Sequence, residues 1–132
     1  MTYYTLQAQT GYLWQEESIE PDLATKAQDF ATLMVDSEFE DWDRTTWTGS
    51  GIPNEIADVA ELFGTAKYME LAAIRGGPES DTKKLAEEIM TKAHDTAHRI
   101  RNAGGPWDAA TGLRIAPKTS DGGARFLEMY PT

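Results

Sequence analysis

Two histidines are the residues whose spacing first suggests chemistry. His94 and His98 lie four positions apart, so a helix would place both on one face at the spacing of two metal ligands. The zinc-protease motif needs a glutamate directly after its first histidine, whereas this chain has Asp95 there. Asp95 and Glu128 are available as a third ligand, and no spacing favours either. We therefore expect solvated histidines near the C-terminal end of their helix, and no metal site.

An acidic run, residues 38–43, could collect oxygen ligands for calcium. It lacks the alternating acids and central glycine of a calcium loop, so a solvated acidic face is the preferred interpretation. The serines lack a nucleophile elbow, and the glycine-rich turns match neither a P-loop nor a dinucleotide fingerprint. The chain has no cysteine, which excludes thiolate nucleophiles and disulfides. We therefore expect no catalytic residue and no cofactor.

The composition describes a small acidic domain. The 132 residues suit a single domain, and 22 acidic against 12 basic residues give a net charge of -10. Such a surface repels the nucleic-acid backbone; it suits a basic protein partner, a surface past which DNA slides, or a salty habitat. The mean hydropathy of -0.52 favours a thin core. No signal peptide or membrane span is expected, which indicates an intracellular origin.

The elements that must position these residues are helices. Apolar spacing predicts one helix over 21–40, a second over 54–75, and a third from Ser80 or Asp81 to the glycine pair at 104–105. The third is alanine-rich and narrow, so it should pack closely against one neighbour. The acidic end of the first helix opposes the helix dipole, so we expect it to fray or to meet a partner's positive charge.

The C-terminal part changes character. Residues 113–115 and 125–130 favour extended structure and flank a turn signal at 120–123, so the two segments could pair as a hairpin. A lone hairpin is marginal in water, so this tail needs the helical body or another chain. The expected fold is mainly α: a small bundle of three to five helices over 1–105, with an extended docking tail over 106–132 that can form a short β-hairpin.

The four tryptophans lie outside the apolar stripes of the predicted helices or at their edges. Tryptophan is enriched at the centres of protein interfaces, and it equally often covers a thin core. Trp47 and Trp107 have loop-like surroundings, which favours the interface interpretation for them over Trp14 and Trp42.

The order of these features resembles one protein family. The segments that carry the resemblance are Ala24–Phe30, Phe39–Trp42 and Ile52–Leu62, followed by a third helix and an extended tail. Over roughly residues 20–103 the chain is similar to the head-to-tail adaptor (connector, or head-completion) proteins of long-tailed phages and related gene-transfer particles.

The resemblance implies a virion structural protein in the neck of the particle, made in the host cytoplasm. Copies would form a ring, usually of twelve, between the portal protein and the next tail or stopper component, and DNA would pass through the lumen without specific binding. No membrane or cofactor is implied. The expected portal-docking or neighbour-docking residues of the tail are Leu113, Ile115, Phe126, Leu127, Met129 and Tyr130. The expected contacts to a neighbouring subunit or tail component are Trp42, Arg44, Trp47 and Trp107.

A different class of function remains as an alternative. The chain could be a small acidic regulatory protein that binds a basic or DNA-binding protein, with a salt-sensitive affinity. An enzyme ranks third, because no constellation of residues supports one.

Overall fold

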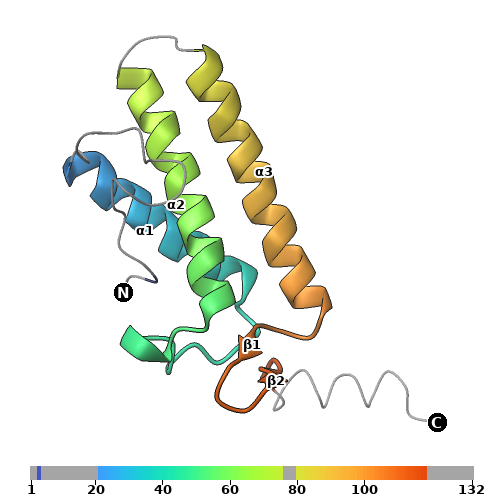
Figure 1. Cartoon of the computed structure of the whole chain (residues 1–132). Helices are drawn as coiled ribbons and strands as arrows, with labels where there is room; N and C mark the ends of the chain where they lie inside the picture. The colour runs from blue at the N-terminus through green and yellow to red at the C-terminus, as the bar shows by residue number, and fades with distance from the viewer. Residues whose placement is uncertain (1–2, 4–20, 76–79, 119–132) are drawn as a thin grey trace.

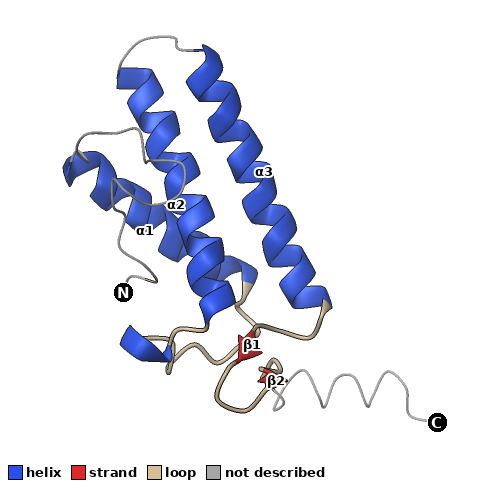
Figure 2. Ribbon diagram, in the orientation of Figure 1, coloured by secondary structure: helices blue, strands red, loops and turns tan. Residues whose placement is uncertain are grey.

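The computed structural model describes residue 3, residues 21–75 and residues 80–118 of the chain. Three long helices make up most of this part (Figures 1 and 2). Two short antiparallel strands follow the third helix, so the expected mainly helical bundle with a short hairpin is confirmed. The elements in chain order are α1 (Pro21–Glu38), the single-turn 3₁₀ helix η2 (Gly49–Gly51), α2 (Asn54–Arg75), α3 (Ser80–Asn102), β1 (Trp107–Asp108) and β2 (Leu113–Arg114).

Helix α2 lies at the centre of the bundle and packs against both α1 and α3 (Figure 1). Its buried side chains recur every three or four residues, as a helix that faces two neighbours requires. Helix α3 packs on α2 mainly through small side chains, which allow a close approach, as its alanine-rich sequence predicts. The buried residues of α3 are Ala86, Ile89, Ala93, Ala97 and Ile100.

The core has two parts. At one end, Leu23 and Ala27 of α1 meet Ala66 and Met69 of α2 and Ile89 of α3. The other part, around the loop between α1 and α2, is dominated by large aromatic side chains and therefore buries more apolar surface per residue. Its largest buried members include Tyr3, Phe39, Trp42, Trp47, Ile56, Val59 and Phe63.

The helix boundaries largely follow the sequence expectations. Helix α2 has the predicted bounds, and α3 begins at Ser80 as predicted. Helix α1 ends at Glu38, two residues before the predicted end at residue 40. The reason is that the chain turns inward: Phe39 is fully buried, and the backbone N–H of Trp42 donates to the carbonyl oxygen of Phe39 over 3.0 Å.

Two glycines end α3. Gly104 and Gly105 have φ angles of 107° and 128°, a region that favours glycine. The N–H of Gly105 donates to the carbonyl oxygen of Ile100 over 2.9 Å, which satisfies one of the last carbonyls of the helix. A Cβ atom at Gly105 would lie 1.9 Å from the carbonyl oxygen of Ile115, so the chain that returns after β2 can approach only a glycine.

The hairpin joins β2 to β1, with Trp107 opposite Arg114 and Asp108 opposite Leu113. The sequence did not indicate β1, which lies directly after the glycine turn and needs only a short loop. Pairing of residues 113–115 with residues 125–130 stays a prediction, because residues 125–130 lie outside the described part of the chain.

Hydrogen bonds join the hairpin segment to the helical body. The indole N–H of Trp42 donates to the carbonyl oxygen of Ile115 over 2.7 Å, and the N–H of Lys118 donates to that of Asp41 over 2.7 Å. Each of these two hydrogen bonds joins a residue before the domain boundary predicted at residue 105 to a residue after it. Residues 106–118 are therefore held on the helical body. Within the described segments, no helix combines the length and apolar character needed to cross a membrane.

Candidate protein-binding surface

Arg44 organises the loop between α1 and α2. Its Nη1 donates to the carbonyl oxygens of Phe39 (2.6 Å) and Trp42 (3.3 Å), and its Nε lies 3.1 Å from Oδ1 of Asp36. These carbonyls follow the end of α1, where cations are favoured by the helix dipole. The positive charge that the sequence placed as a possible partner contact thus binds its own chain. A contact between Arg44 and another subunit stays a prediction.

Tyr3 completes this arrangement. Its hydroxyl donates to Oδ1 of Asp36 over 2.5 Å, and its ring lies edge-on to Trp47 with centroids 6.4 Å apart. Burial raises the pKa of the Tyr3 hydroxyl, and the hydrogen bond to the Asp36 carboxylate raises it further. Asp36 therefore joins a residue near the N-terminus to Arg44, and both hold the loop against α1.

Trp42 and Trp47 lie in the core. Their exposed fractions are 6% and 1%, and both rings pack edge-on against Phe39, at centroid distances of 5.4 and 6.1 Å. Such pairs add to the stability gained by burial. The structure thus gives these two tryptophans a packing role, and their contact with a neighbouring subunit stays a prediction. Trp14 lies outside the described residues.

Trp107 is different, because 48% of it is exposed. It stands on β1 opposite Arg114, whose guanidinium carbon lies 5.4 Å from the centre of the Trp107 ring. Leu113, next to Arg114, is 67% exposed. We call Trp107, Leu113 and Arg114 the hairpin platform. Tryptophan and arginine are enriched at the centres of protein interfaces, and the exposed Leu113 adds apolar surface beside them.

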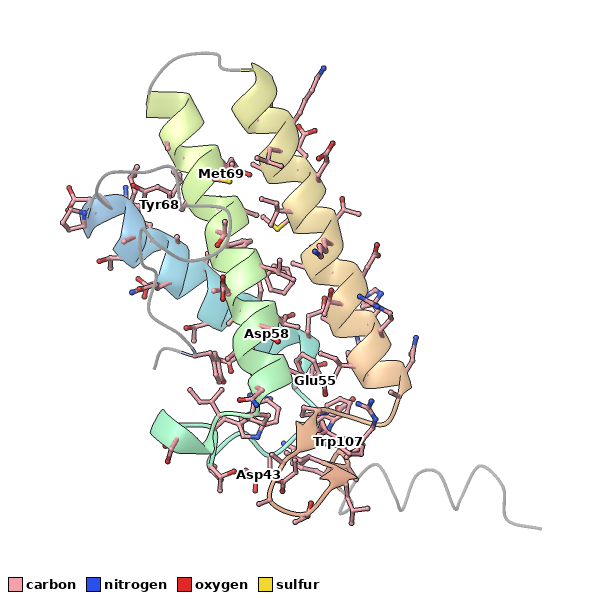
Figure 3. The ribbon with its side chains drawn as sticks, viewed as in Figure 1. Asp43, Glu55, Asp58, Tyr68, Met69 and Trp107 are labelled. Carbon is pink, nitrogen blue, oxygen red and sulfur yellow. The ribbon has the colours of Figure 1, made fainter. Side chains whose placement is uncertain are left out.

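The hairpin platform is fixed to the start of α2. Oε1 of Glu55 accepts the backbone N–H of Trp107 over 2.7 Å and lies 3.4 Å from Nη1 of Arg114. The same Nη1 donates to the carbonyl oxygen of Gly105 over 2.8 Å. Figure 3 shows Trp107 just beyond Glu55, at the end of the bundle. The Arg114 side chain and the Trp107 backbone, held in this way, lose little conformational entropy when a partner binds.

A groove of about 510 Å³ borders the hairpin platform, between the start of α2 and the end of α3. Asp58 and Arg99 contribute charges of opposite sign to its lining, and Ile100 contributes an apolar side chain. This mixed lining matches the polar rim that commonly surrounds the apolar centre of a protein interface.

The two histidines face the end of α1. Oε2 of Glu38 lies 3.5 Å from Nδ1 of His94, and Oε1 lies 3.6 Å from Nε2 of His98 and 3.0 Å from Nη1 of Arg101. The His94 ring also lies edge-on to Phe63, with centroids 5.1 Å apart. The positive charge expected near the acidic end of α1 is therefore present, and α3 of the same chain supplies it.

The contact between Glu38 and the two histidines was not predicted. Asp95 and Glu128 were the candidate companions, whereas Glu38 is separated from His94 by more than fifty positions. The one sequence feature that indicates this contact is the combination of an acidic end of α1 with a basic end of α3. Among the described residues, no group of three His, Cys, Asp or Glu side chains is arranged to hold a metal ion.

The acidic run does not converge on one point. Glu38 turns to α3, whereas Asp43 accepts hydrogen bonds from the hydroxyl (2.7 Å) and the N–H (3.0 Å) of Thr45. These bonds, led by the hydroxyl, lower the pKa of Asp43. The acids of this run therefore serve separate local contacts.

The predicted docking residues of the tail fall into two groups. Leu113 is exposed, whereas Ile115 is partly buried and packs against the aromatic part of the core. Their contact with a portal stays a prediction. The remaining four, Phe126, Leu127, Met129 and Tyr130, lie outside the described residues.

Helix α1 carries one large exposed apolar residue. The exposed fraction of Leu33 is 64%. The helical period of 3.6 residues explains this, because Leu33 lies almost opposite the buried Ala31 and Val35. A helical wheel would have identified it as a surface leucine.

Comparison with known proteins gives no relative. No protein-family model matches the chain, and neither a curated protein nor a solved structure is similar to it.

Proposed function

We propose that this chain is a structural protein of a virus particle, a head-to-tail adaptor whose copies form a ring between the portal and the tail of a long-tailed phage. DNA passes through the lumen of that ring without specific binding. The observation that carries the proposal is the hairpin platform, which presents Trp107 and Leu113 to a protein partner from a fixed position. Its support in the sequence is the order of elements described above.

Two further features support a binding role over a catalytic one. The two histidines are engaged by Glu38 and by packing on Phe63, and Arg44 is engaged by backbone carbonyls and Asp36. The residue types that most often carry chemistry thus have structural partners here. The net charge of -10 disfavours adhesion of DNA to the ring.

The acidic regulator is the second candidate, and one observation favours it. Residues 21–75 carry 11 acidic and 4 basic side chains, which is a strongly negative surface for a basic partner. Residues 80–118, in contrast, carry 5 acidic and 7 basic side chains. A protein that imitates the charge of DNA needs acids over its whole contact face, so the first candidate is preferred.

The decisive experiment is cryo-electron microscopy of particles purified from the source of this sequence. We expect a ring of copies directly below the portal, with the three helices of each copy fitting the density. Particles should also contain the chain by mass spectrometry. Intact tailed particles that lack the chain would overturn the proposal. A salt-sensitive complex with a basic cellular protein would then support the regulator.

The hairpin platform gives a sharper test in the same system. A phage that lacks the gene is supplied with the wild-type chain, with Trp107→Ala, or with the control Leu85→Ala, which changes an exposed leucine of α3. We expect the Trp107 variant to reduce the yield of tailed particles at least about tenfold, as loss of an interface hot spot does. Equal yields with all three chains would contradict a role for Trp107.

A further inference from the structure

Tyr3 reaches the helical body from a distant part of the sequence. Residues 4–20 separate it from α1, and its hydrogen-bond partner Asp36 lies 33 positions away. The side chain is nevertheless almost completely buried, with an exposed fraction of 3%. It lies against the end of α1 and the loop that follows α1. We call Asp36, Arg44 and Trp47, which face the Tyr3 side chain, the tyrosine slot.

The walls of the tyrosine slot are held by contacts that do not involve Tyr3. Nε of Arg44 lies 3.1 Å from Oδ1 of Asp36, and Nη1 of Arg44 donates to the carbonyl oxygen of Phe39 over 2.6 Å. Trp47 packs edge-on against Phe39, and its backbone N–H donates to the carbonyl oxygen of Arg44 over 3.1 Å. These contacts remain when the occupant is absent, so the slot is preformed, as small-ligand sites usually are.

The chemistry of the slot distinguishes a phenol from other aromatic rings. Trp47 packs edge-on against the ring, a contact that any aromatic ring can make. The hydroxyl, in contrast, donates to Oδ1 of Asp36 over 2.5 Å and has the Arg44 side chain as a second hydrogen-bond partner. A group that donates to a carboxylate and accepts from a guanidinium needs both a proton and a lone pair, and a hydroxyl has both. Burial and Asp36 raise the pKa of the Tyr3 hydroxyl, so the slot favours the neutral phenol over the phenolate.

We propose that the tyrosine slot is a binding site for a tyrosine side chain, which Tyr3 occupies from within the chain and a tyrosine of another polypeptide can occupy in its place. Tyr3 then acts as a tethered ligand, with an effective concentration on the order of millimolar. A partner segment displaces it by adding contacts of its own to those of the phenol. The inference is independent of the proposed function, because it concerns a site that the hairpin platform does not include.

The first test returns the tyrosine side chain to the slot as a free molecule. Tyr3→Ala in the full-length chain empties the slot, and p-cresol, which is the tyrosine side chain without its backbone, is the probe. Toluene has the same ring without the hydroxyl and is the control ligand. Dissociation constants follow from the rise of the urea midpoint with ligand concentration, measured by circular dichroism.

We expect p-cresol to bind at least about tenfold more tightly than toluene, because only p-cresol supplies the donor that Asp36 accepts. If Tyr3→Ala lowers the helicity of the chain, p-cresol should restore it and toluene should not. Equal effects of the two compounds, or no effect of either, would overturn the proposal.

A matched pair of variants tests the role of Asp36. Adding Asp36→Ala to the Tyr3→Ala chain removes the acceptor, so the preference for p-cresol over toluene should disappear. Adding Asp29→Ala instead removes an exposed carboxylate of the same helix and should leave the preference within about twofold. Equal preferences in the two double variants would contradict recognition of the hydroxyl by Asp36.

A peptide of residues 1–8 tests a tyrosine that a second polypeptide presents. The peptide contains both Tyr3 and Tyr4, so its Tyr3→Phe and Tyr4→Phe forms are a matched pair. In fluorescence anisotropy with the Tyr3→Ala chain, the Tyr3→Phe peptide should bind at least about tenfold more weakly than the unchanged peptide, and the Tyr4→Phe peptide within about twofold of it. The wild-type chain should bind the unchanged peptide at least about tenfold more weakly, because its own Tyr3 competes. Equal binding to both chains, or no binding to the Tyr3→Ala chain, would overturn the proposal.

Phosphorylation of the same peptide separates a phenol site from a phosphate site. A phosphate on Tyr3 of the peptide removes the donor and places negative charge beside Asp36, so binding to the Tyr3→Ala chain should weaken at least about tenfold. Binding that is equal or tighter would assign the slot to the phosphate through Arg44, and it would overturn recognition of the neutral phenol.

Discussion

The indole N–H of Trp42 donates to the carbonyl oxygen of Ile115 over 2.7 Å, and this hydrogen bond joins residues 73 positions apart in the sequence. Trp42 is buried beside Phe39, while Ile115 follows β2 directly and packs against the same part of the core. Each strand of the hairpin has only two residues, so pairing between them contributes little stability. The hydrogen bond from this core tryptophan therefore acts together with Glu55 and the Lys118–Asp41 bond to hold the hairpin platform in position.

Trp42→Phe should loosen the hairpin from the helical body. Phenylalanine keeps an aromatic ring but has no donor, so the carbonyl oxygen of Ile115 loses its partner at a cost of about 1–2 kcal/mol. We expect a lower urea midpoint of unfolding. Hydrogen–deuterium exchange should increase most in residues 113–118, because one of the bonds that hold this segment on the helical body is removed.

Trp107→Phe is the matched control for Trp42→Phe. The same substitution on an exposed ring breaks no side-chain hydrogen bond that holds the hairpin, so we expect a change in stability within about 0.5 kcal/mol. Similar urea midpoints for the two variants would show that the Trp42 bond does not fix the hairpin.

Gly105→Ala should be far more damaging than Gly104→Ala. Both glycines have a positive φ angle, so alanine is strained at either position by about 1–2 kcal/mol. At Gly105 the added Cβ would also lie 1.9 Å from the carbonyl oxygen of Ile115, whereas at Gly104 it meets nothing within 4 Å. We expect Gly105→Ala to cost at least about 2 kcal/mol more in urea unfolding, with loss of hairpin protection in hydrogen exchange. Equal costs would indicate that the hairpin moves away without penalty.

The helices could be predicted from the sequence because their signals are local. Apolar spacing, Pro21 and the glycine pair at 104–105 define periods and ends within a few residues of where they act. The end of α1 was misplaced by two residues because Phe39 and Trp42 turn into the core, and only the rest of the fold decides this. The partner of β2 was missed for a related reason, since a two-residue strand has no periodicity to detect.

The candidate surface could be predicted only in part. Trp107 and Leu113 were named as contact residues, and both are exposed. Trp42 and Trp47 were predicted as contact residues in the same way, but both side chains fill the core of this small bundle. Their position in a loop does not reveal that they are buried. Glu38 could not be paired with His94, His98 and Arg101 from the sequence, because more than fifty positions separate them and only the tertiary structure brings them together.

Glu38→Gln should weaken the attachment of the end of α1 to α3. The carboxylate is only 12% exposed and lies 3.0 Å from Nη1 of Arg101, with both histidines nearby. The amide keeps the shape but removes the charge, so we expect a loss of about 1 kcal/mol in urea unfolding that shrinks at high salt. Glu40→Gln, at an exposed position two residues on, should change stability by less than about 0.3 kcal/mol. Equal losses from both would contradict a specific role for Glu38.

Tyr3→Phe should remove a loss of folding stability that the wild-type chain shows at alkaline pH. Burial, together with the Asp36 carboxylate, raises the pKa of Tyr3 in the folded state, so the folded chain binds this proton more tightly than the unfolded chain. The resulting stability is fully present below the unfolded pKa of about 10 and is lost as the pH rises above it. Wild type should exceed Tyr3→Phe by about 1–2 kcal/mol in urea unfolding near neutral pH, because the variant lacks the hydrogen bond to Asp36. The difference should fall above about pH 10. If it stays constant from about pH 7 to pH 11, then Tyr3 does not hold its proton in the folded state.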